Sequence, residues 1–514
     1  MTKNKLERVS NFVISILLYS LIVISIMGGS AALVDDLKTS TSHTVALAIL
    51  VTMIGIICFL VKFNAPSKLK KIKNLKRLLL ILIVVITITW QFNLVFALSG
   101  RMGWDPAITS YVSTNRSLLH TGLSYDYFSY YPNNFLIVAV GRLFWKFLNL
   151  IGYTNYSNFV FGSGIVNYIL IDFSILLLYS AIKIFFNQRI AFASSSISLI
   201  MIGLSPVNVI PYTDTFAYFI GVVLIYLLSK FLETESKKNK IIFMTFLGVI
   251  AGFGYYIKPT TLIFTIALGL VAVVNLINIK RKDWKFLAIV VIAFGSSFIS
   301  TSFIIKSFQY DNNIIKIDKR KTFPVNHFIA MGMEGSGGYS SYDVIENIKI
   351  KNPVDRRKFN SDLIKKRLKE KGTLGYLKFL VIKQINNTAN GTFGWGLEGG
   401  YLYSPFKEKS VSSLQKIQRK IFMTKGRRNE ASPNWNGHKL LIQMIWVSVL
   451  FSTMLSLRSE ELRVQLFKLC VLGGLIFLLF FEGGRSRYLI QFLPFFFTLS
   501  GIGIEKMMYL RSKN

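Results

Sequence analysis

The chain has 514 residues, of which 52% are hydrophobic and only 17% are charged. A soluble protein of this length carries more charge and fewer long apolar runs. Apolar stretches of about 20 residues recur along most of the chain, long enough to cross roughly 30 Å of hydrocarbon as helices. The composition therefore excludes a soluble enzyme and predicts an all-α polytopic membrane protein. Both cysteines lie in apolar stretches, so they give no information about a disulfide framework and cannot form a metal cluster.

The apolar stretches predict about twelve membrane spans. The first stretch follows Lys3, Lys5 and Arg8 and is longer than a usual signal-peptide core, so we interpret it as a span and not as a cleaved leader. The expected spans are 11–29, 44–62, 78–98, 159–183, 190–208, 213–230, 241–257, 260–279, 286–305, 439–456, 464–481 and 488–508.

Basic residues in the short loops predict the orientation, because such loops lie on the cytoplasmic side. The clusters at 3–8 and 62–77 place the N-terminus and the loop before the third span inside, and the next loop outside. The segment from Phe135 to Leu150 is apolar but contains Arg142 and Lys146. We interpret it as a helix in the interface, because a crossing there would place the later basic loops outside. Both termini are then cytoplasmic.

The sequence divides into five regions on this basis. They are N-terminal transmembrane helices (1–98), a first large extracytoplasmic loop with interfacial helices (99–158), a transmembrane core (159–306), a basic extracytoplasmic insert (307–437) and C-terminal transmembrane helices (438–514). The insert contains 24 Lys and Arg against 11 Asp and Glu, which suits a solvated surface or an anionic partner. Within it we expect a turn-rich loop near the site (Met331 to Tyr339), a basic amphipathic helix (Pro353 to Lys371) and a short apolar segment on the membrane (Leu374 to Ile385).

The first expected outer loop, Gly100 to Asn134, contains the candidate catalytic base. Asp105 lies between Trp104 and Pro106, and a short helical pattern and a tyrosine-rich run follow it. A carboxylate at the membrane surface can accept the proton of a hydroxyl group as that oxygen attacks a sugar carbon. The alternative role is a helix N-cap, because Asp followed by Pro often begins a helix. The sequence leaves both roles open.

Three basic residues are candidates for binding a lipid phosphate. Lys258 lies at the expected outer end of a span, and Arg485 and Arg487 lie before the last span. Basic residues are uncommon at outer ends, and a cation there can stabilise a departing phosphate. The alternatives are a lysine that extends from a helix end toward lipid headgroups, and a local ion pair between Arg485 and Glu482.

Five further residues are candidates for the same site. Asp214, at the start of a span, is either a second catalytic acid or an N-cap. Tyr131, Asp126, His120 and Glu482 are candidates for binding the substrate. The sequence contains no HExxH, CxxC or Gly-rich phosphate-binding motif, so we predict no cofactor and no metal site, and leave a divalent cation open.

The order of these features resembles the GT-C superfamily of membrane glycosyltransferases. The resemblance rests on Trp104-Asp105 and Pro132-Asn133-Asn134, and then on the segments Pro211 to Asp214, Ile257 to Thr260 and Arg485 to Leu489. It covers most of the chain from about residue 78 to residue 508. Two features depart from the superfamily pattern: Asp105 stands without a second acid in its loop, and this loop follows the third span instead of the first.

The resemblance implies a GT-C-type glycosyltransferase that uses a polyprenyl-phosphate or polyprenyl-diphosphate donor. Asp105 takes the role of the base, while Lys258, Arg485 and Arg487 bind the phosphate. The chain is similar to Gram-positive enzymes that decorate or attach teichoic acids, of the lipoteichoic acid ligase type. The implied reaction moves a sugar or glycopolymer from an undecaprenyl-linked carrier to a glycolipid or polymer hydroxyl on the outer face, without a nucleic-acid partner. The alternative is a lipid or polysaccharide flippase or another transporter.

Overall fold

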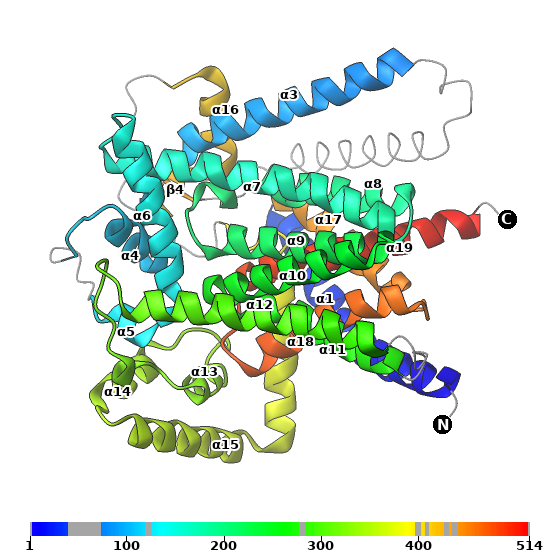
Figure 1. Ribbon diagram of the computed structural model, residues 1–514. Helices are drawn as coiled ribbons and strands as arrows, with labels where there is room; N and C mark the ends of the chain where they lie inside the picture. The colour runs from blue at the N-terminus through cyan, green and yellow to red at the C-terminus, as the bar shows by residue number, and fades with distance from the viewer. Residues whose placement is uncertain are drawn as a thin grey trace.

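The computed structural model describes residues 3–39, 73–118, 125–276, 284–395, 402–406, 411–425, 431–433 and 439–511. Most of these residues are helical, and the long helices run side by side in one bundle (Figure 1). The expected span at 44–62 lies outside the described residues. The architecture confirms the prediction of an all-α polytopic membrane protein.

Within the described residues, nine helices are long and apolar enough to cross a membrane, and they coincide with nine of the expected spans. They are α1 (Lys3–Thr39), α3 (Lys73–Leu98), α7 (Tyr156–Phe185), α9 (Thr213–Glu233), α10 (Lys237–Ile257), α12 (Trp284–Tyr310), α17 (Lys439–Ser456), α18 (Leu462–Phe480) and α19 (Leu493–Arg511), which continues the 3-10 helix η8 (Ser486–Phe492). The two chain ends lie together at one end of this bundle (Figure 1).

The expected span 190–208 forms a shorter α-helix than the sequence predicts, and the helix of the expected span 260–279 begins later, at Leu262. Their helices are α8 (Gln188–Ser198), which ends in a π-helical turn at Leu199–Gly203, and α11 (Leu262–Leu276). A 3-10 turn that begins with proline lies next to each helix. The turn η4 (Pro206–Val209) follows α8, and the turn η5 (Pro259–Thr261) precedes α11. Proline lacks an N–H and has a fixed φ, so it starts a new helical turn and ends the preceding helix.

Glycines allow α10 and α12 to approach closely. A Cβ atom at Gly248 would lie 2.4 Å from the carbonyl oxygen of Phe294, and one at Gly252 would lie 3.1 Å from that of Phe298. Small residues at such positions let two helix backbones touch, which compensates for the weak hydrophobic drive between helices in lipid. This contact fixes the end of α10, where Lys258 lies.

The first loop forms a compact group of short elements at the bundle end opposite the chain termini (Figure 1). They are β1 (Gly100–Met102), α4 (Trp104–Ser113), α5 (Tyr127–Tyr130), η2 (Pro132–Asn134) and α6 (Phe135–Leu150). Helix α6 has 16 residues and crosses α7 in Figure 1 instead of running along it. This length and direction agree with the prediction that Phe135 to Leu150 does not span the membrane.

The insert adds four helices and several short strands to this end of the bundle. Its elements are η7 (Lys319–Lys321), α13 (Val325–Met331), α14 (Ser341–Lys349), α15 (Pro353–Thr388), β2 (Leu402–Pro405), α16 (Ser413–Phe422), β3 (Met423–Lys425) and β4 (Ala431–Pro433). Strand β2 pairs antiparallel with β1 of the first loop, and β3 pairs with β4. The expected basic helix from Pro353 to Lys371 is confirmed as the first half of α15.

Two buried arginines organise the insert. The guanidinium of Arg367 donates to both oxygens of Asp343 at 2.8 Å and to the carbonyl oxygen of Ala330 at 2.7 Å. Arg356 is 1% exposed. Its guanidinium donates to the carbonyl oxygens of Asn347, Arg320, Lys321, Thr322 and Ile350. Several donors in one planar group can close several turns at once.

The insert and the first loop form one body although about 190 residues separate them in sequence. Lys321 binds Asp126 at 2.7 Å, and the backbone N–H of Asp318 donates to the Ser129 hydroxyl at 2.9 Å. The rings of Phe323 and Tyr130 stack with centroids 5.0 Å apart. The first loop is therefore held by protein on the side that faces the insert.

The insert should lose stability in mild acid through His327, which is fully buried against Phe323 and Phe328. Burial lowers the pKa of this imidazole to about 4, below the value of about 6.5 that it has in an unfolded chain. Between these two pKa values only the unfolded state binds a proton at His327. The free energy of unfolding therefore falls as the pH drops from about 6.5 to about 4, by roughly 3 kcal/mol at most.

The test is limited proteolysis of the insert in membranes between pH 7 and pH 4.5, with wild type compared to His327→Phe. The phenylalanine fits the aromatic surroundings and cannot titrate, so the pH dependence of cleavage should be weaker in the variant. Equal pH dependence in both proteins would contradict the assignment.

Candidate functional site

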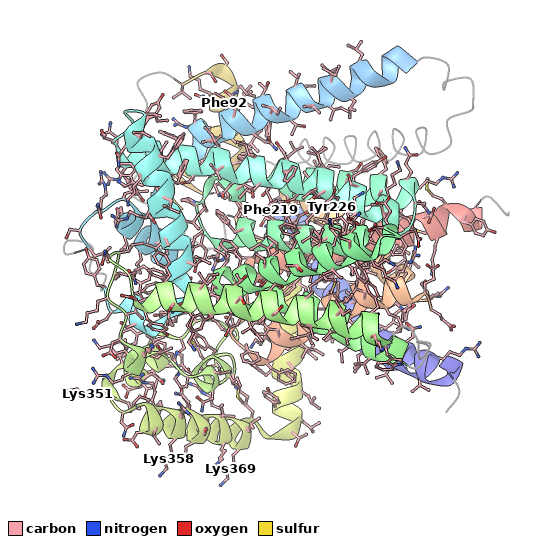
Figure 2. All side chains as sticks on the ribbon, viewed as in Figure 1. Phe92, Phe219, Tyr226, Lys351, Lys358 and Lys369 are labelled. Atoms are coloured by element: carbon pink, nitrogen blue, oxygen red, sulfur yellow. The ribbon has the colours of Figure 1, made fainter. Side chains whose placement is uncertain are left out.

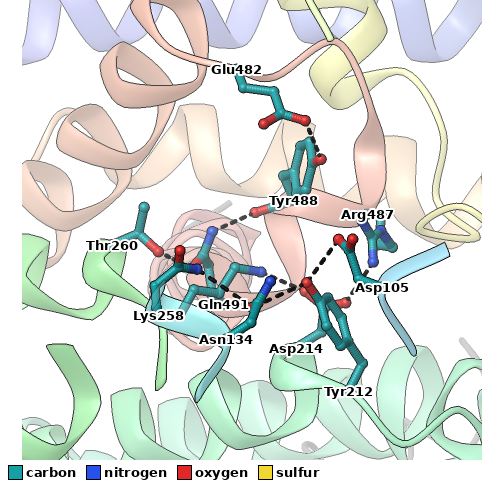
Figure 3. A network of polar contacts seen from close by, with 11 residues as sticks. Asp105, Asn134, Tyr212, Asp214, Lys258, Thr260, Glu482, Arg487, Tyr488 and Gln491 are labelled. Carbon is teal, nitrogen blue, oxygen red and sulfur yellow. Dashed lines mark hydrogen bonds and ion pairs between the residues drawn. The ribbon is translucent and has the colours of Figure 1, made fainter. Parts of the chain in front are cut away.

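A network of polar side chains lies at the bundle end opposite the chain termini. It brings together residues from the first loop, from the starts of α9 and η8, and from the end of α10 (Figure 3). The segments are far apart in the sequence, by 273 residues for Asp214 and Arg487, yet their side chains contact one another through hydrogen bonds. Most of the predicted site residues belong to this network.

Asp214 forms the centre of an ion cluster with two of the predicted phosphate-binding residues. Its Oδ1 lies 2.5 Å from Nζ of Lys258, and its Oδ2 lies 3.3 Å from Nη1 of Arg487 (Figure 3). The side chains of all three residues are mostly buried, with exposed fractions between 5% and 16%. Because both carboxylate oxygens are engaged by cations, Asp214 is a counter-ion in this structure.

The local fold explains why these three charges meet. Asp214 lies in the first turn of α9, and Lys258 ends α10 in an extended conformation just before Pro259. Arg487 lies in η8, which is tied to η5 by the hydrogen bond between the Thr260 hydroxyl and the Gln491 side-chain oxygen. The proline turn η5 therefore follows an extended Lys258 instead of continuing α10.

Aromatic rings separate the cations from the acid of the first loop. The guanidinium of Arg487 lies 5.6 Å from the ring centre of Tyr212 and 5.1 Å from that of Tyr488. Nζ of Lys258 lies 5.7 Å from the Tyr488 ring centre. Rings at these distances stabilise a cation by the charge distribution of their faces.

Asp105 lies beside the cluster and does not cap a helix. The N-cap of α4 is Gly103, and Asp105 follows within the first turn, so the N-cap alternative is wrong. The Tyr212 hydroxyl donates to Oδ2 of Asp105 at 3.0 Å (Figure 3). A second hydroxyl, that of Tyr127, also bonds to the carboxylate, and burial together with the Asp105 charge raises the pKa of Tyr127 far above its usual value.

Asn134 joins the two tyrosines that contact Asp105. Its side-chain N–H donates to the Tyr127 hydroxyl, and its side-chain oxygen lies 3.4 Å from the Tyr212 hydroxyl. Asn134 follows Pro132 in η2, and it is buried. The Pro-Asn-Asn segment therefore orients the two hydroxyls that hold the Asp105 carboxylate.

Glu482 places a second acid near Asp105. The Tyr488 hydroxyl donates to its Oε1 at 3.0 Å. Burial raises the pKa of Glu482, and the charge of Asp105 raises it further, although the Tyr488 hydrogen bond and the charges of Arg485 and Arg487 oppose this. Asp105 is therefore alone in its loop but not in the folded protein.

The glycine-rich loop of the insert, which the sequence predicts to be turn-rich and near the site, contacts the residue that follows Glu482. The N–H of Gly483 donates to the carbonyl oxygen of Gly337 at 2.8 Å. Gly484 has a φ of +69°, and a Cβ atom there would lie 2.3 Å from the carbonyl oxygen of Ser336. Only glycine fits this turn, because both the conformation and the close approach exclude a side chain.

Tyr131 and Trp104 border the same region. The Tyr131 hydroxyl is buried and has no hydrogen-bond partner among the described residues. Burial raises the pKa of Tyr131, as do the nearby charges of Glu482 and Asp105. The Arg485 guanidinium lies 5.2 Å from the Trp104 ring centre, so Arg485 stands next to the Asp105 loop.

One predicted residue lies apart from the network, and another falls outside the described residues. Asp126 is about half exposed and pairs with Lys321 of the insert, so it connects the first loop to η7. His120 lies outside the described residues. The described part of the chain contains no group of three His, Cys, Asp or Glu side chains that could hold a metal ion.

Sequence reasoning missed Tyr212, Asn134 and Tyr127 as site residues. Tyr212 adjoins Asp214 in sequence, and Asn134 and Tyr127 lie in the polar loop that contains Asp105. The available signal for Tyr212 and Asn134 is that both belong to segments on which the resemblance rests, Pro211 to Asp214 and Pro132-Asn133-Asn134.

The family model described as "Conserved hypothetical integral membrane protein" matches residues 3–508. The chain belongs to this family. No curated protein matches the sequence. Among solved structures, the chain is similar to the crystal structure of ArnT from Cupriavidus metallidurans bound to undecaprenyl phosphate, with 11% identity and a TM-score of 0.33. That match covers 83% of this chain and 78% of ArnT, and a score this low carries no argument about the mechanism of the family.

Removing the central carboxylate of the ion cluster should strongly destabilise this family member. Asp214→Asn leaves Lys258 and Arg487 buried without their counter-ion, and breaking a buried pair in this way costs about 3–5 kcal/mol. The buried thiol of Cys470 reports unfolding with a thiol-reactive dye in a Cys58→Ser background. We expect a clearly lower unfolding temperature than in wild type.

The matched control is Asp126→Asn, which removes a half-exposed ion pair. Such pairs contribute about 0–1 kcal/mol, so this variant should unfold close to wild type. An Asp214→Asn protein as stable as the control would show that Asp214 is not the required counter-ion.

Proposed function

We propose that this protein is a membrane glycosyltransferase or ligase that uses a polyprenyl-phosphate-linked donor. The observation that carries this proposal is the position of Tyr212. Its hydroxyl donates to Asp105, and its ring faces the guanidinium of Arg487. A carboxylate able to accept a proton and a cation able to bind a phosphate therefore contact the same side chain.

In the proposed reaction, Asp105 accepts the proton of an acceptor hydroxyl. The acceptor oxygen forms a bond to the anomeric carbon of the donor sugar as the bond from that carbon to the phosphate oxygen breaks, with inversion. The bonding electrons leave on the phosphate. The Tyr127 and Tyr212 hydroxyls hold the carboxylate in one orientation, which supports general-base catalysis through positioning.

Lys258 and Arg487 are the proposed groups that stabilise the departing phosphate. Preorganised cations that need not move during the reaction are effective catalysts for such charge development. Asp214, predicted as a second catalytic acid, instead has the proposed role of holding these two cations in place. Arg485, beside Trp104, is the third proposed phosphate ligand, and Tyr131 and Glu482 border the space for the sugar.

The proposed orientation puts the site on the extracytoplasmic side. The site lies at the bundle end opposite both chain termini (Figure 1). The helix ends on the terminal side are rich in basic residues, as cytoplasmic loops are. They include Lys183, Arg189, Lys230, Lys237, Lys238, Lys240, Lys285, Arg458 and Arg463.

The proposed acceptor or transferred unit is an anionic glycopolymer of the teichoic acid type, carried on undecaprenyl phosphate or diphosphate. Lys351, Lys358 and Lys369 extend away from the surface of the insert (Figure 2). A surface with this charge attracts a phosphate-rich polymer or glycolipid. No resident cofactor is proposed, and a divalent cation is a possible addition to be tested by chelation.

The first test is Asp105→Asn in a strain that lacks the gene, followed by profiling of lipid-linked and wall-linked glycopolymers. We expect the deletion to lose one linked polymer or sugar, and the variant to restore at most about 1% of it, because removing a general base costs 10²–10⁴-fold in rate. Asp126→Asn should restore the wild-type profile. Full restoration by Asp105→Asn, at equal protein level, would show that this acid is structural.

The second test measures binding of undecaprenyl phosphate to the purified protein. Lys258→Met should weaken binding at least tenfold, because a cation that contacts a phosphate contributes about 1.5–3 kcal/mol. Lys321→Met, in the insert, is the control and should bind as wild type does. If both variants bind alike and proteoliposomes move a lipid-linked saccharide without forming product, the flippase alternative is correct.

A further inference from the structure

Helix α15 is interrupted at Gly372, and its two halves differ in composition. This residue has a φ of +60° and a ψ of 177°, which interrupts the helix between Pro353 and Thr388. The two halves run in different directions in Figure 1, and the second half leads back toward the bundle. The first half carries basic residues on its surface, whereas the second half begins with Thr373 and Leu374 and is mostly uncharged.

The second half of α15 has an inverted distribution of polar and apolar side chains. Leu374 is 82% exposed, Leu377 54%, Val381 42% and Ile382 46%. The spacing of these four residues puts them on one face of the helix. The polar residues that follow are fully buried: Lys383, Gln384, Asn387 and Thr388.

Three of these buried side chains, Lys383, Gln384 and Asn387, donate hydrogen bonds to parts of the protein outside the helix. The Gln384 side-chain N–H donates to the Ser25 hydroxyl of α1 at 3.0 Å, and Nζ of Lys383 donates to the carbonyl oxygen of Phe481 at 2.6 Å. A helix in water turns its apolar face inward and its polar face outward. A helix in lipid does the reverse, because only protein can satisfy its polar groups there.

We propose that residues 373–388 form a helix that lies in the plane of the bilayer and contacts lipid acyl chains through Leu374, Leu377, Val381 and Ile382. The opposite, buried face of the same helix contacts the spanning helix α1 through Gln384. The proposal goes beyond the proposed reaction and does not depend on it. The partner of this surface is lipid hydrocarbon.

The residues around the apolar face suit the headgroup region of the membrane. Nζ of Lys371 lies 4.8 Å from the ring centre of Phe379, and the Phe379 ring stacks on that of Tyr376. Lysine and tyrosine at the edge of an apolar surface are typical of helices at the interface, where their polar ends reach the headgroups. Lys378 adds a second cation on the exposed side.

The inner face of the same helix holds the loop that contains Glu482. Lys383 donates to the carbonyl oxygens of Gly332 and Phe481, so it joins the insert to this loop. The side chain of Asn387 accepts from the N–H of Gly484 at 2.6 Å and donates to the carbonyl oxygen of Leu478 at 3.3 Å. The lipid-facing helix therefore carries part of the wall of the candidate site.

The test uses single cysteines labelled with the fluorophore NBD in a Cys58→Ser, Cys470→Ala background. The protein is placed in nanodiscs of phosphatidylcholine and phosphatidylglycerol, with or without doxyl-labelled lipid. Labels at Leu374→Cys, Leu377→Cys and Ile382→Cys should emit at shorter wavelength and lose at least half of their intensity to the doxyl lipid. Labels at Lys358→Cys and Lys369→Cys, on the first half of α15, should be quenched by iodide in water instead.

Two results would overturn the proposal. Equal iodide quenching at Leu374 and Lys358 would show that the apolar face is in water. Shielding from both quenchers would show that a protein surface, such as a second copy of the chain, covers it. Wild-type protein treated with a diazirine-labelled lipid provides a measurement that needs no variant, and the proposal requires crosslinks within 373–382 and none within 353–367.

Discussion

The buried carboxylate of Asp214 is the constraint on which the arrangement of the site depends. Two cations that lie on different helices share it, and burying three charges is unfavourable unless their geometry is good. This requirement fixes the start of α9, the end of α10 and η8 relative to one another. Since Tyr212 precedes Asp214 by two residues, the same cluster also fixes the hydroxyl that orients Asp105.

The positive charge of the insert has two separate origins. Some of its basic residues lie on the surface, but Arg356 and Lys383 are buried and bond to backbone carbonyl oxygens. Arg367 is also buried and bonds to the Asp343 carboxylate and to the carbonyl oxygen of Ala330. These three cations hold turns that have few other donors, since the insert is built from short helices. A count of charges along the chain cannot separate a binding surface from such internal donors.

The sequence predicted much of the fold because hydrophobic length and basic loops are local properties. Nine described spans, the first half of α15 and the position of the glycine-rich loop follow from short windows of residues. The ends of α8 and α11 did not, because proline turns override apolar composition there. The pairing of Asp214 with Lys258 and Arg487, and the nearness of Glu482 to Asp105, depend on how distant helices pack, and no local pattern encodes that.

The antiparallel pair of β1 and β2 joins residues 100–102 to residues 402–405, and Asp105 lies just beyond it. During synthesis, the first loop is therefore made some 300 residues before its partner strand β2. Arg487 is made later still. During that interval the Trp104 to Asn134 region has neither its sheet partner nor its cation neighbour. Contacts of such long sequence separation form slowly and late. Assembly of this site therefore cannot be complete before α18 and η8 have been synthesised.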